Sequence, residues 1–233
     1  MKSRILYTLL ALYAITITAQ TNVTSLVKNY SFENGLANWT NDGFQTQNNT
    51  AFTLKAGEWY AEKWVPEGGT VTNASLIQNI KITSAGTYTL TARAQNIQQA
   101  SPSLVCKGVK LFIGDMSVDV NTAGTYSVTF TAVGSAVKLG LMVTSATGNW
   151  IAADHFMLSY TYDADKVNTQ LQAEIDVARQ LQNDANGSHS AKEALQQAID
   201  AAASYINATS ADGITDIVDK LQAAEYACKE RSP

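Results

Sequence analysis

The spacing of the apolar residues changes once along the chain, near residue 163, and this change constrains the fold more than any other feature of the sequence. Before it, apolar and polar residues alternate over short runs, which is typical of half-buried β-strands. After it, apolar residues recur every three or four positions, which is typical of amphipathic helices. Twelve of the 14 glycines and all four tryptophans precede residue 160. The sequence therefore predicts two regions of different architecture.

The first region, 20–162, is predicted to be a series of short strands separated by turns. The runs GTYTLTARA and GTYSVTFTA are near copies, and strict alternation in both indicates antiparallel strands with one face in a core. In the first run this face carries Tyr88, Leu90 and Ala92. Further strands are predicted at 25–33, 108–114, 136–144 and 149–162. About eight or nine strands in roughly 140 residues predict an all-β jelly-roll sandwich.

The second region, 163–233, is predicted to contain three helices, at 163–184, 190–207 and 209–230. Ser190 and Glu193 have the spacing of a capping box at the start of the second helix. Three amphipathic helices joined by short loops predict a three-helix bundle. The expected apolar stripes are Leu171, Ile175, Ala178 and Leu181 on the first helix, and Ile217, Leu221, Ala224 and Cys228 on the third.

The N-terminus has the features of a signal peptide. A basic start, MKSR, precedes the apolar run ILYTLLALYAITI, and a small-residue cleavage site follows, with the cut expected after Ala19. We therefore predict a signal peptide at 1–19, no membrane span in the mature chain, and a secreted, periplasmic or cell-surface location. Export permits a disulfide between Cys106 and Cys228, but two separately buried thiols are the favoured alternative.

Charge and motifs exclude several classes of function. The net charge is −4 and no Lys/Arg cluster is present, which argues against a nucleic-acid partner. The sequence has no Gly-x-Ser-x-Gly elbow, HExxH motif, phosphate-binding loop or dinucleotide fingerprint. A pair of carboxylates would suffice for glycoside hydrolysis, but most carboxylates are simply solvated. We therefore expect a protein that is not an enzyme.

The run GEWYAEKWVPEGG concentrates Trp59, Tyr60 and Trp64 around Glu62. Flat aromatic rings can stack on the apolar faces of sugars while a carboxylate binds the hydroxyls, so these four residues are candidate carbohydrate-binding residues. The alternative is that the aromatic residues fill the core. Because Trp59 and Trp64 are five residues apart, a regular strand would place one of them in the core. Trp39 and Trp150 are expected in the core.

Three segments carry a family resemblance. NYSFENGLANW (29–39) is similar to the N-terminal strand of galactose-binding-like β-sandwich carbohydrate-binding modules, and NWIAADHFMLSY (149–160) resembles their last strand. LIQNIKITSAGTYTLTARAQ (76–95) resembles the same modules in secreted proteins of Bacteroidetes-type bacteria, where they often accompany glycoside hydrolases. The helical region resembles the small three-helix spacer modules known as FIVAR-type.

This resemblance implies a non-catalytic carbohydrate-binding module with a helical spacer, a glycan or polysaccharide as partner, and a possible appended or partner glycoside hydrolase. Two alternatives remain open at this point. The chain could be a structural or adhesive surface protein that binds another protein, or a fragment of a larger secreted glycoside hydrolase.

The resemblance also implies a structural calcium ion, held by Glu33, Asp154 and backbone carbonyls. Calcium takes six to eight oxygen ligands, so two carboxylates supply only part of the shell. The sequence departs from the family pattern at Tyr30, where Pro is common, and at His155, where Asn or Asp would add an oxygen ligand. The alternative is that Glu33 accepts hydrogen bonds from backbone amides.

Overall fold

The structure is a computed structural model that describes residues 20–184 and 188–230; the predicted signal peptide lies outside the described residues. The strands are β1 (Thr21–Asn22), β2 (Thr40–Asp42), β3 (Gln45–Gln47), β4 (Tyr60–Trp64), β5 (Asn73–Lys81), β6 (Gly86–Ile97), β7 (Val109–Ile113), β8 (Met116–Asp119), β9 (Gly124–Ala132), β10 (Ala136–Thr144) and β11 (Trp150–Thr161). The helices are a short 3-10 helix, η1 (Thr24–Leu26), and the α-helices α1 (Ala164–Asp184), α2 (His189–Ala203) and α3 (Ile214–Glu230).

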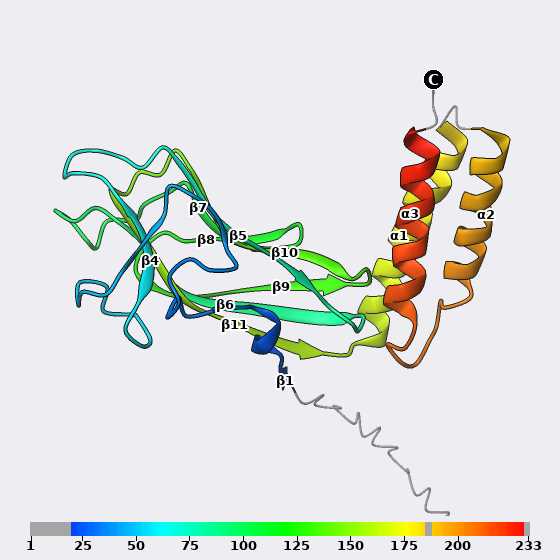
Figure 1. Cartoon of the computed structure of the whole chain (residues 1–233), viewed down its shortest axis with the longest axis horizontal. Helices are drawn as coiled ribbons and strands as arrows, with labels where there is room; N and C mark the ends of the chain where they lie inside the picture. Colours follow the sequence, from blue (N-terminus) through cyan, green and yellow to red (C-terminus); the bar gives the residue numbers. More distant parts are fainter. Residues whose placement is uncertain (1–19, 185–187, 231–233) are drawn as a thin grey trace, which may run out of the picture.

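The strands form two antiparallel sheets that pack as a β-sandwich (Figure 1). One sheet has the order β3-β4-β11-β6-β9, with β1 also paired to β11, and the other has the order β2-β5-β10-β7-β8. Counted from β4 to β11 as strands one to eight, the main strands lie in the orders 1-8-3-6 and 2-7-4-5. This is the strand order of a jelly roll, so the predicted fold of the first region is confirmed.

The core lies between the two sheets and follows the predicted alternation. Tyr88, Leu90 and Ala92 of β6 are all buried there, opposite Val128 of the near-copy strand β9. Trp39 is also buried, as predicted, and its ring packs against Phe156 with centroids 4.9 Å apart. These residues form one apolar cluster that both sheets share.

The predicted strand at 25–33 is wrong. This segment is η1 followed by turns, because Asn29 (φ 52°) and Phe32 (φ 58°) have left-handed backbone conformations that interrupt the regular pairing of a strand. The Asn29 side chain organises the turns: its amide donates to the carbonyl oxygens of Gly35 (2.9 Å) and Ala37 (3.1 Å), and its oxygen accepts from the Asn34 N–H (3.0 Å). The apolar residues of the segment reach the core without pairing as a strand.

The three predicted helices are present and contribute to one apolar cluster. The cap of α2 differs from the prediction, because the side chain of Ser188, not Ser190, accepts the hydrogen bond from the Ala191 N–H (3.3 Å). The expected stripe of α3 is present, with Leu221 and Cys228 buried and Ile217 and Ala224 packed against the same cluster, but the buried face is wider than predicted. The stripe of α1 is as expected, with Leu171, Ile175 and Ala178 fully buried and Leu181 packed beside them. On α3 the buried residues are Ile214, Thr215, Val218, Leu221, Glu225 and Cys228.

Both cysteines are buried and free, which agrees with the favoured alternative of two separate thiols. Cys228 belongs to the helical cluster, whereas Cys106 lies in the loop before β7. No helix within the described residues is long and apolar enough to span a membrane.

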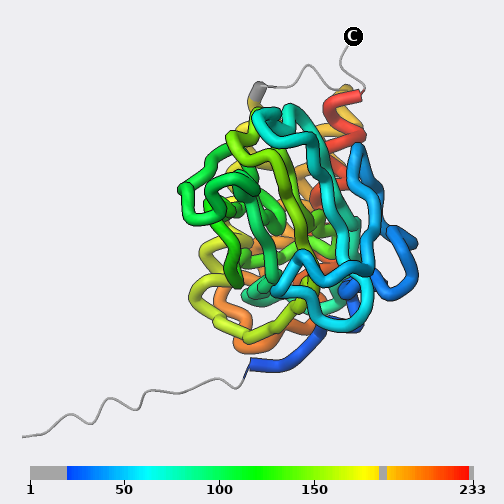
Figure 2. Tube along the Cα trace, turned by 90° about the vertical axis from the view of Figure 1, so that its left-hand side faces the viewer, coloured from blue at the N-terminus to red at the C-terminus, as the bar shows by residue number. Residues whose placement is uncertain are grey.

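The helices lie at one end of the sandwich, across the direction of its long strands (Figure 1). Figure 2 looks at the molecule from the opposite end of the sandwich, with the helices behind it. At the end next to the helices, two loops of the sandwich contact them, because Ala85 and Val133 belong to the helical apolar cluster. The Ser135 N–H donates to the Asp219 carboxylate (2.8 Å), and the Thr215 hydroxyl donates to the Thr83 carbonyl (3.2 Å). The helices are therefore docked on the sandwich by both apolar and polar contacts.

This docking predicts that changes in a sandwich loop destabilise the helical region. Val133→Ala should lower the free energy of unfolding of the helices by about 1–2 kcal/mol, because it removes buried apolar volume from their cluster. Helical circular dichroism during denaturant unfolding measures this loss. Val105→Ala is the matched control, because Val105 is 63% exposed. Equal stability of the two variants would contradict the docking.

Candidate functional site

A hollow lies on the outer face of the sheet that contains β4 and β11. Because side chains alternate along a strand, Ala61 and Ile151 point into the core, and their neighbours Tyr60, Glu62 and Trp150 point to the other side. The strands pair in antiparallel register, with Trp64 opposite Trp150. This register brings residues that are 86 positions apart in the chain to the same small area of the surface.

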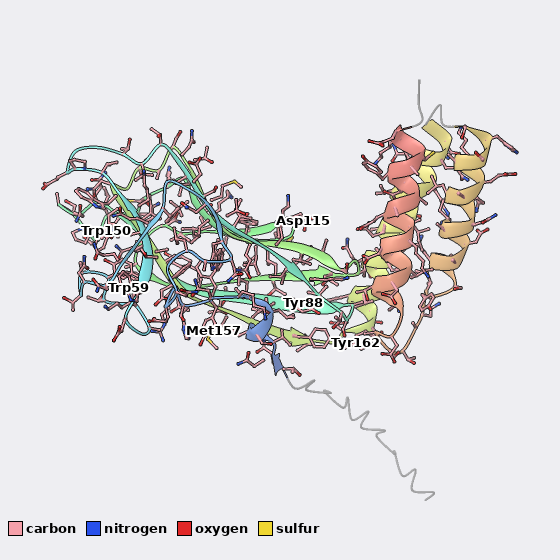
Figure 3. All side chains as sticks on the ribbon, viewed as in Figure 1. Trp59, Tyr88, Asp115, Trp150, Met157 and Tyr162 are labelled. Carbon is pink, nitrogen blue, oxygen red and sulfur yellow. The ribbon has the colours of Figure 1, made fainter. Side chains whose placement is uncertain are left out.

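The loop before β4 covers part of this outer face. Phe52 and Tyr60 are fully buried there, with ring centroids 5.2 Å apart, and they pack with Ile97 and Trp150 in a small apolar cluster separate from the main core. Beside the cluster, a volume of about 270 Å³ stays open. It is lined by Gln47, Asn49, Ala51, Glu62, Trp64, Gln99 and Trp150. Trp150 lies at the end of the sandwich away from the helices (Figure 3).

Glu62 is the only ionisable residue in this lining, and its side chain is held by three donors. Its Oε1 accepts from the Gln45 amide (3.1 Å), and its Oε2 accepts from the Trp150 indole N–H (2.9 Å) and the Tyr60 hydroxyl (3.3 Å). These donors come from three strands, so the position of the carboxylate is fixed by the sheet and not by one loop.

Of the predicted aromatic residues, Trp64 presents the largest free surface, with 48% of the residue exposed. Trp59 is half-buried, precedes β4 and is not among the lining residues. Tyr60 is fully buried, so its ring face is closed to a sugar, which corrects its predicted stacking role. Its single hydroxyl proton is instead shared between Asn49 Oδ1 (2.8 Å) and Glu62 Oε2 (3.3 Å), which connects the loop to the strand.

Burial, followed by the nearby Glu62 carboxylate, raises the pKa of Tyr60 from 10.0 to about 12. Tyr60 therefore stays protonated at neutral pH and remains a hydrogen-bond donor. Trp150 is buried in the small apolar cluster, as expected of a core residue, yet its edge also lines the hollow. The predicted core residue Trp150 is thus both buried and part of the lining of the hollow.

Asn149, which the sequence analysis missed, positions one wall of the hollow. It is fully buried, and its amide donates to the Val65 carbonyl (2.9 Å) and to Gln99 Oε1 (2.9 Å), while its oxygen accepts from the Gln99 N–H (2.8 Å). These bonds join the residues that follow β4 and β6. Gln47, Asn49 and Gln99 were also missed, because single amide residues in polar loops carry no recognisable spacing.

The second predicted site, Glu33 with Asp154, holds the backbone turn that leads into β4. Asp154 is fully buried, and its two oxygens accept from the Ala56 N–H and the His155 N–H, both at 2.6 Å. Glu33 accepts from the Glu58 N–H (3.0 Å) and from the Trp59 N–H (3.4 Å). The two carboxylates therefore bracket residues 56–59 and anchor them to the sheet.

Gly57 explains how Glu33 can approach this turn so closely. Gly57 has a φ of 99°, and a Cβ atom at this position would lie 2.1 Å from Glu33 Oε1. Any larger residue would be strained and would displace the carboxylate. The close approach thus depends on glycine at position 57.

Backbone N–H groups surround the carboxylates of Glu33 and Asp154. Four backbone N–H groups point at the carboxylate oxygens, from Ala56, Glu58, Trp59 and His155. His155, at the bulge in β11, adds a ring that packs edge-on against Tyr30 instead of an oxygen ligand. The arrangement fits a hydrogen-bonded anchor, and calcium at this position stays a prediction.

The anchor predicts a stability effect of Glu33. Glu33→Ala should lower the free energy of unfolding by about 1–2 kcal/mol, because backbone N–H groups lose their acceptor. Thermal unfolding with calcium and with a chelator measures the loss. Glu58→Gln is the matched control in the same turn, since the Glu58 residue is exposed. An equal loss in both conditions supports the hydrogen-bonded anchor, and a loss confined to the calcium condition would support the calcium prediction instead.

The burial of Asp154 predicts how stability depends on pH. Burial is the main cause that raises the pKa of Asp154 from 3.8 to about 7, and the nearby Glu33 adds to the shift. The folded state therefore binds this proton more tightly than the unfolded state. The resulting contribution to stability is fully present below about pH 4 and is lost as the pH rises through about 7.

The measurement is the free energy of unfolding at pH 5 and pH 8, in the presence of a chelator. Between these values the wild type should lose more stability than Asp154→Asn, which has no titrating group at this position. Comparing the two proteins cancels the contribution of His155, whose pKa is lowered by burial and which therefore acts in the opposite direction. Parallel pH profiles would contradict the raised pKa of Asp154.

Comparison with known proteins gives matches of structure only. No protein-family model matches the sequence, and no curated protein matches it. Among solved structures, the chain is similar to the carbohydrate-binding module TmCBM61, solved with β-1,4-galactotriose, with 19% identity and a TM-score of 0.45, covering 57% of this chain and 96% of that one. It is also similar to a family 35 carbohydrate-binding module from Clostridium thermocellum, with 11% identity and a TM-score of 0.40, covering 61% of this chain and 98% of that one.

A third similar structure is a Stig cyclase from Fischerella sp. TAU, with 16% identity and a TM-score of 0.45, covering 62% of this chain and all of that one (100%). The similar structures thus include carbohydrate-binding modules and an enzyme. At these identities and scores the similarity identifies no function, because one fold can carry unrelated sites.

Proposed function

We propose that this protein is a non-catalytic glycan-binding protein whose ligand occupies the hollow beside Trp64. The observation that carries the proposal is an indole that is 48% exposed next to a volume of about 270 Å³ lined by amide groups and one fixed carboxylate. A sugar ring needs both an apolar surface for its C–H face and directed polar groups for its hydroxyls. The hollow offers the two together.

The polar groups of the lining are well suited to sugar hydroxyls. Gln47, Asn49 and Gln99 offer amides that both donate and accept, and Glu62 offers an acceptor. Glu62 and Gln99 are already held in the free protein. Gln45, Tyr60 and Trp150 contact the Glu62 carboxylate, and Asn149 makes two hydrogen bonds with Gln99. A preorganised site loses less entropy on binding than a flexible one.

The lining supports binding in preference to hydrolysis. Acid–base glycoside hydrolysis uses a pair of carboxyl groups across the scissile bond. Glu62 is the single carboxylate among the seven lining residues. The proposed role is therefore recognition of a glycan that this chain does not cleave.

We further propose that the chain is exported, with the sandwich as a galactose-binding-like module and the helices as a mount for a further segment or partner, such as a glycoside hydrolase. The helices support this role by their place, since they lie at the opposite end of the sandwich from Trp150 (Figure 3). The strand β11 connects the two ends: its 12 residues run from Trp150 to the start of the helical region, over roughly 36 Å. A segment or partner attached to the helices would therefore lie away from the hollow and leave it open to a ligand.

Affinity electrophoresis and calorimetry with a panel of polysaccharides test the proposal. Trp64→Ala should weaken binding at least about fivefold, because a stacking aromatic side chain contributes more than about 1 kcal/mol. Tyr226→Ala is the control, since it removes an aromatic residue on α3 that is 62% exposed. Binding that survives Trp64→Ala unchanged would contradict the site. Capture of a protein and of no polysaccharide would favour the structural or adhesive alternative.

A further inference from the structure

The hollow carries a negative charge that no cation in its lining balances. Glu62 is only 4% exposed, and the other six lining residues are uncharged. None of the ion pairs that the structure describes includes Glu62. The protein therefore keeps a buried carboxylate beside an open volume without pairing it to lysine, arginine or histidine.

The carboxylate accepts hydrogen bonds from neutral donors only. Gln45 and Trp150 each donate one hydrogen bond to it, and Tyr60 shares its single hydroxyl proton between Glu62 and Asn49. A carboxylate has about four acceptor positions, so three donors leave room for about one more. Oε1 has a single donor and is the oxygen with the larger spare capacity.

A ligand that donates to this position gains more if it is positively charged. The cost of removing the carboxylate from water is already met in the free protein, so an incoming cation gains attraction without adding that cost. A charge-assisted hydrogen bond is roughly twice as strong as a neutral one. A carboxylate on the ligand would be repelled instead.

We propose that the hollow selects glycans that contain protonated amino sugars over their neutral counterparts, and disfavours glycans that contain uronic acids. This inference rests on the proposed function and specifies the chemical class of its ligand. Among the sugars in the site, the one next to Glu62 carries the ammonium group, which donates to the carboxylate while its ring lies against Trp64.

The test uses matched oligosaccharides that differ at one substituent. Oligomers of β-1,4-linked glucose, glucosamine, N-acetylglucosamine and glucuronate share one backbone, and galactose, galactosamine and galacturonate oligomers form a second series. Calorimetry is performed at low salt and at a pH where the amines are protonated. In the series that binds, the amine should bind about tenfold more tightly than the neutral and N-acetyl forms, and the uronate more weakly than either.

Three further measurements separate charge from shape. Glu62→Gln keeps the size of the side chain and removes its charge, so the tenfold preference for the amine should disappear. Trp64→Ala should weaken all ligands by a similar factor and leave the preference in place. Because Glu62→Gln can also reduce stability, the wild type is titrated at rising salt as well, where the advantage of the amine should shrink while binding of the neutral sugar stays constant.

The outcomes distinguish this inference from the proposed function. Equal binding of amine and neutral sugars overturns the inference and leaves the proposed function standing. A preference for the amine that persists in folded Glu62→Gln also overturns it, because the charge then comes from another residue. If no oligosaccharide or polysaccharide binds, the proposed function fails and the inference fails with it.

Discussion

The antiparallel pairing of β4 with β11 is the interaction on which the rest of the structure depends. It places Trp64 opposite Trp150 and Glu62 opposite Ala152, and the alternation of side chains then sends one set of residues into the core and the other to the hollow. The same strand, β11, pairs with β6 along most of its length and continues to the start of the helices. A shift of this pairing by one residue would exchange the two faces and would bury the site or expose the core.

The protein buries two carboxylates near this pairing and handles each one differently. Asp154 is fully buried and lies near Glu33, so its charged form is disfavoured and its pKa is raised to about 7, although its two short backbone hydrogen bonds oppose this shift. Glu62 accepts from three side chains and faces open volume. The first carboxylate holds a turn in place, and the second lines the hollow that we propose as the ligand site. The two carboxylates are thus both buried but differ in their surroundings, because Asp154 contacts backbone and Glu62 borders an open volume.

Local pattern predicted much of the fold, and the errors have identifiable causes. The strands at 124–132 and 136–144 match the alternating runs to the residue, because each strand has one face in the core and one in water. The segment 25–33 has a similar apolar pattern but is not a strand, since Asn29 and Phe32 take left-handed conformations that the Asn29 side chain stabilises. Pattern shows which residues are apolar, but it does not show which backbone hydrogen bonds they will form.

The sequence by itself determined the two architectures, the alternation of the main strands, and the concentration of aromatic residues around Glu62. Only the tertiary structure decided that Tyr60 is closed to solvent, that Trp64 is open, and that Asn149 and Gln99 form a wall beside them. The reason is physical: exposure depends on what packs over a strand, and here the covering loop and the partner strand come from distant parts of the chain. A one-dimensional pattern fixes which way a side chain points from its own strand, whereas the segments that meet it there are fixed by the pairing of the sheet.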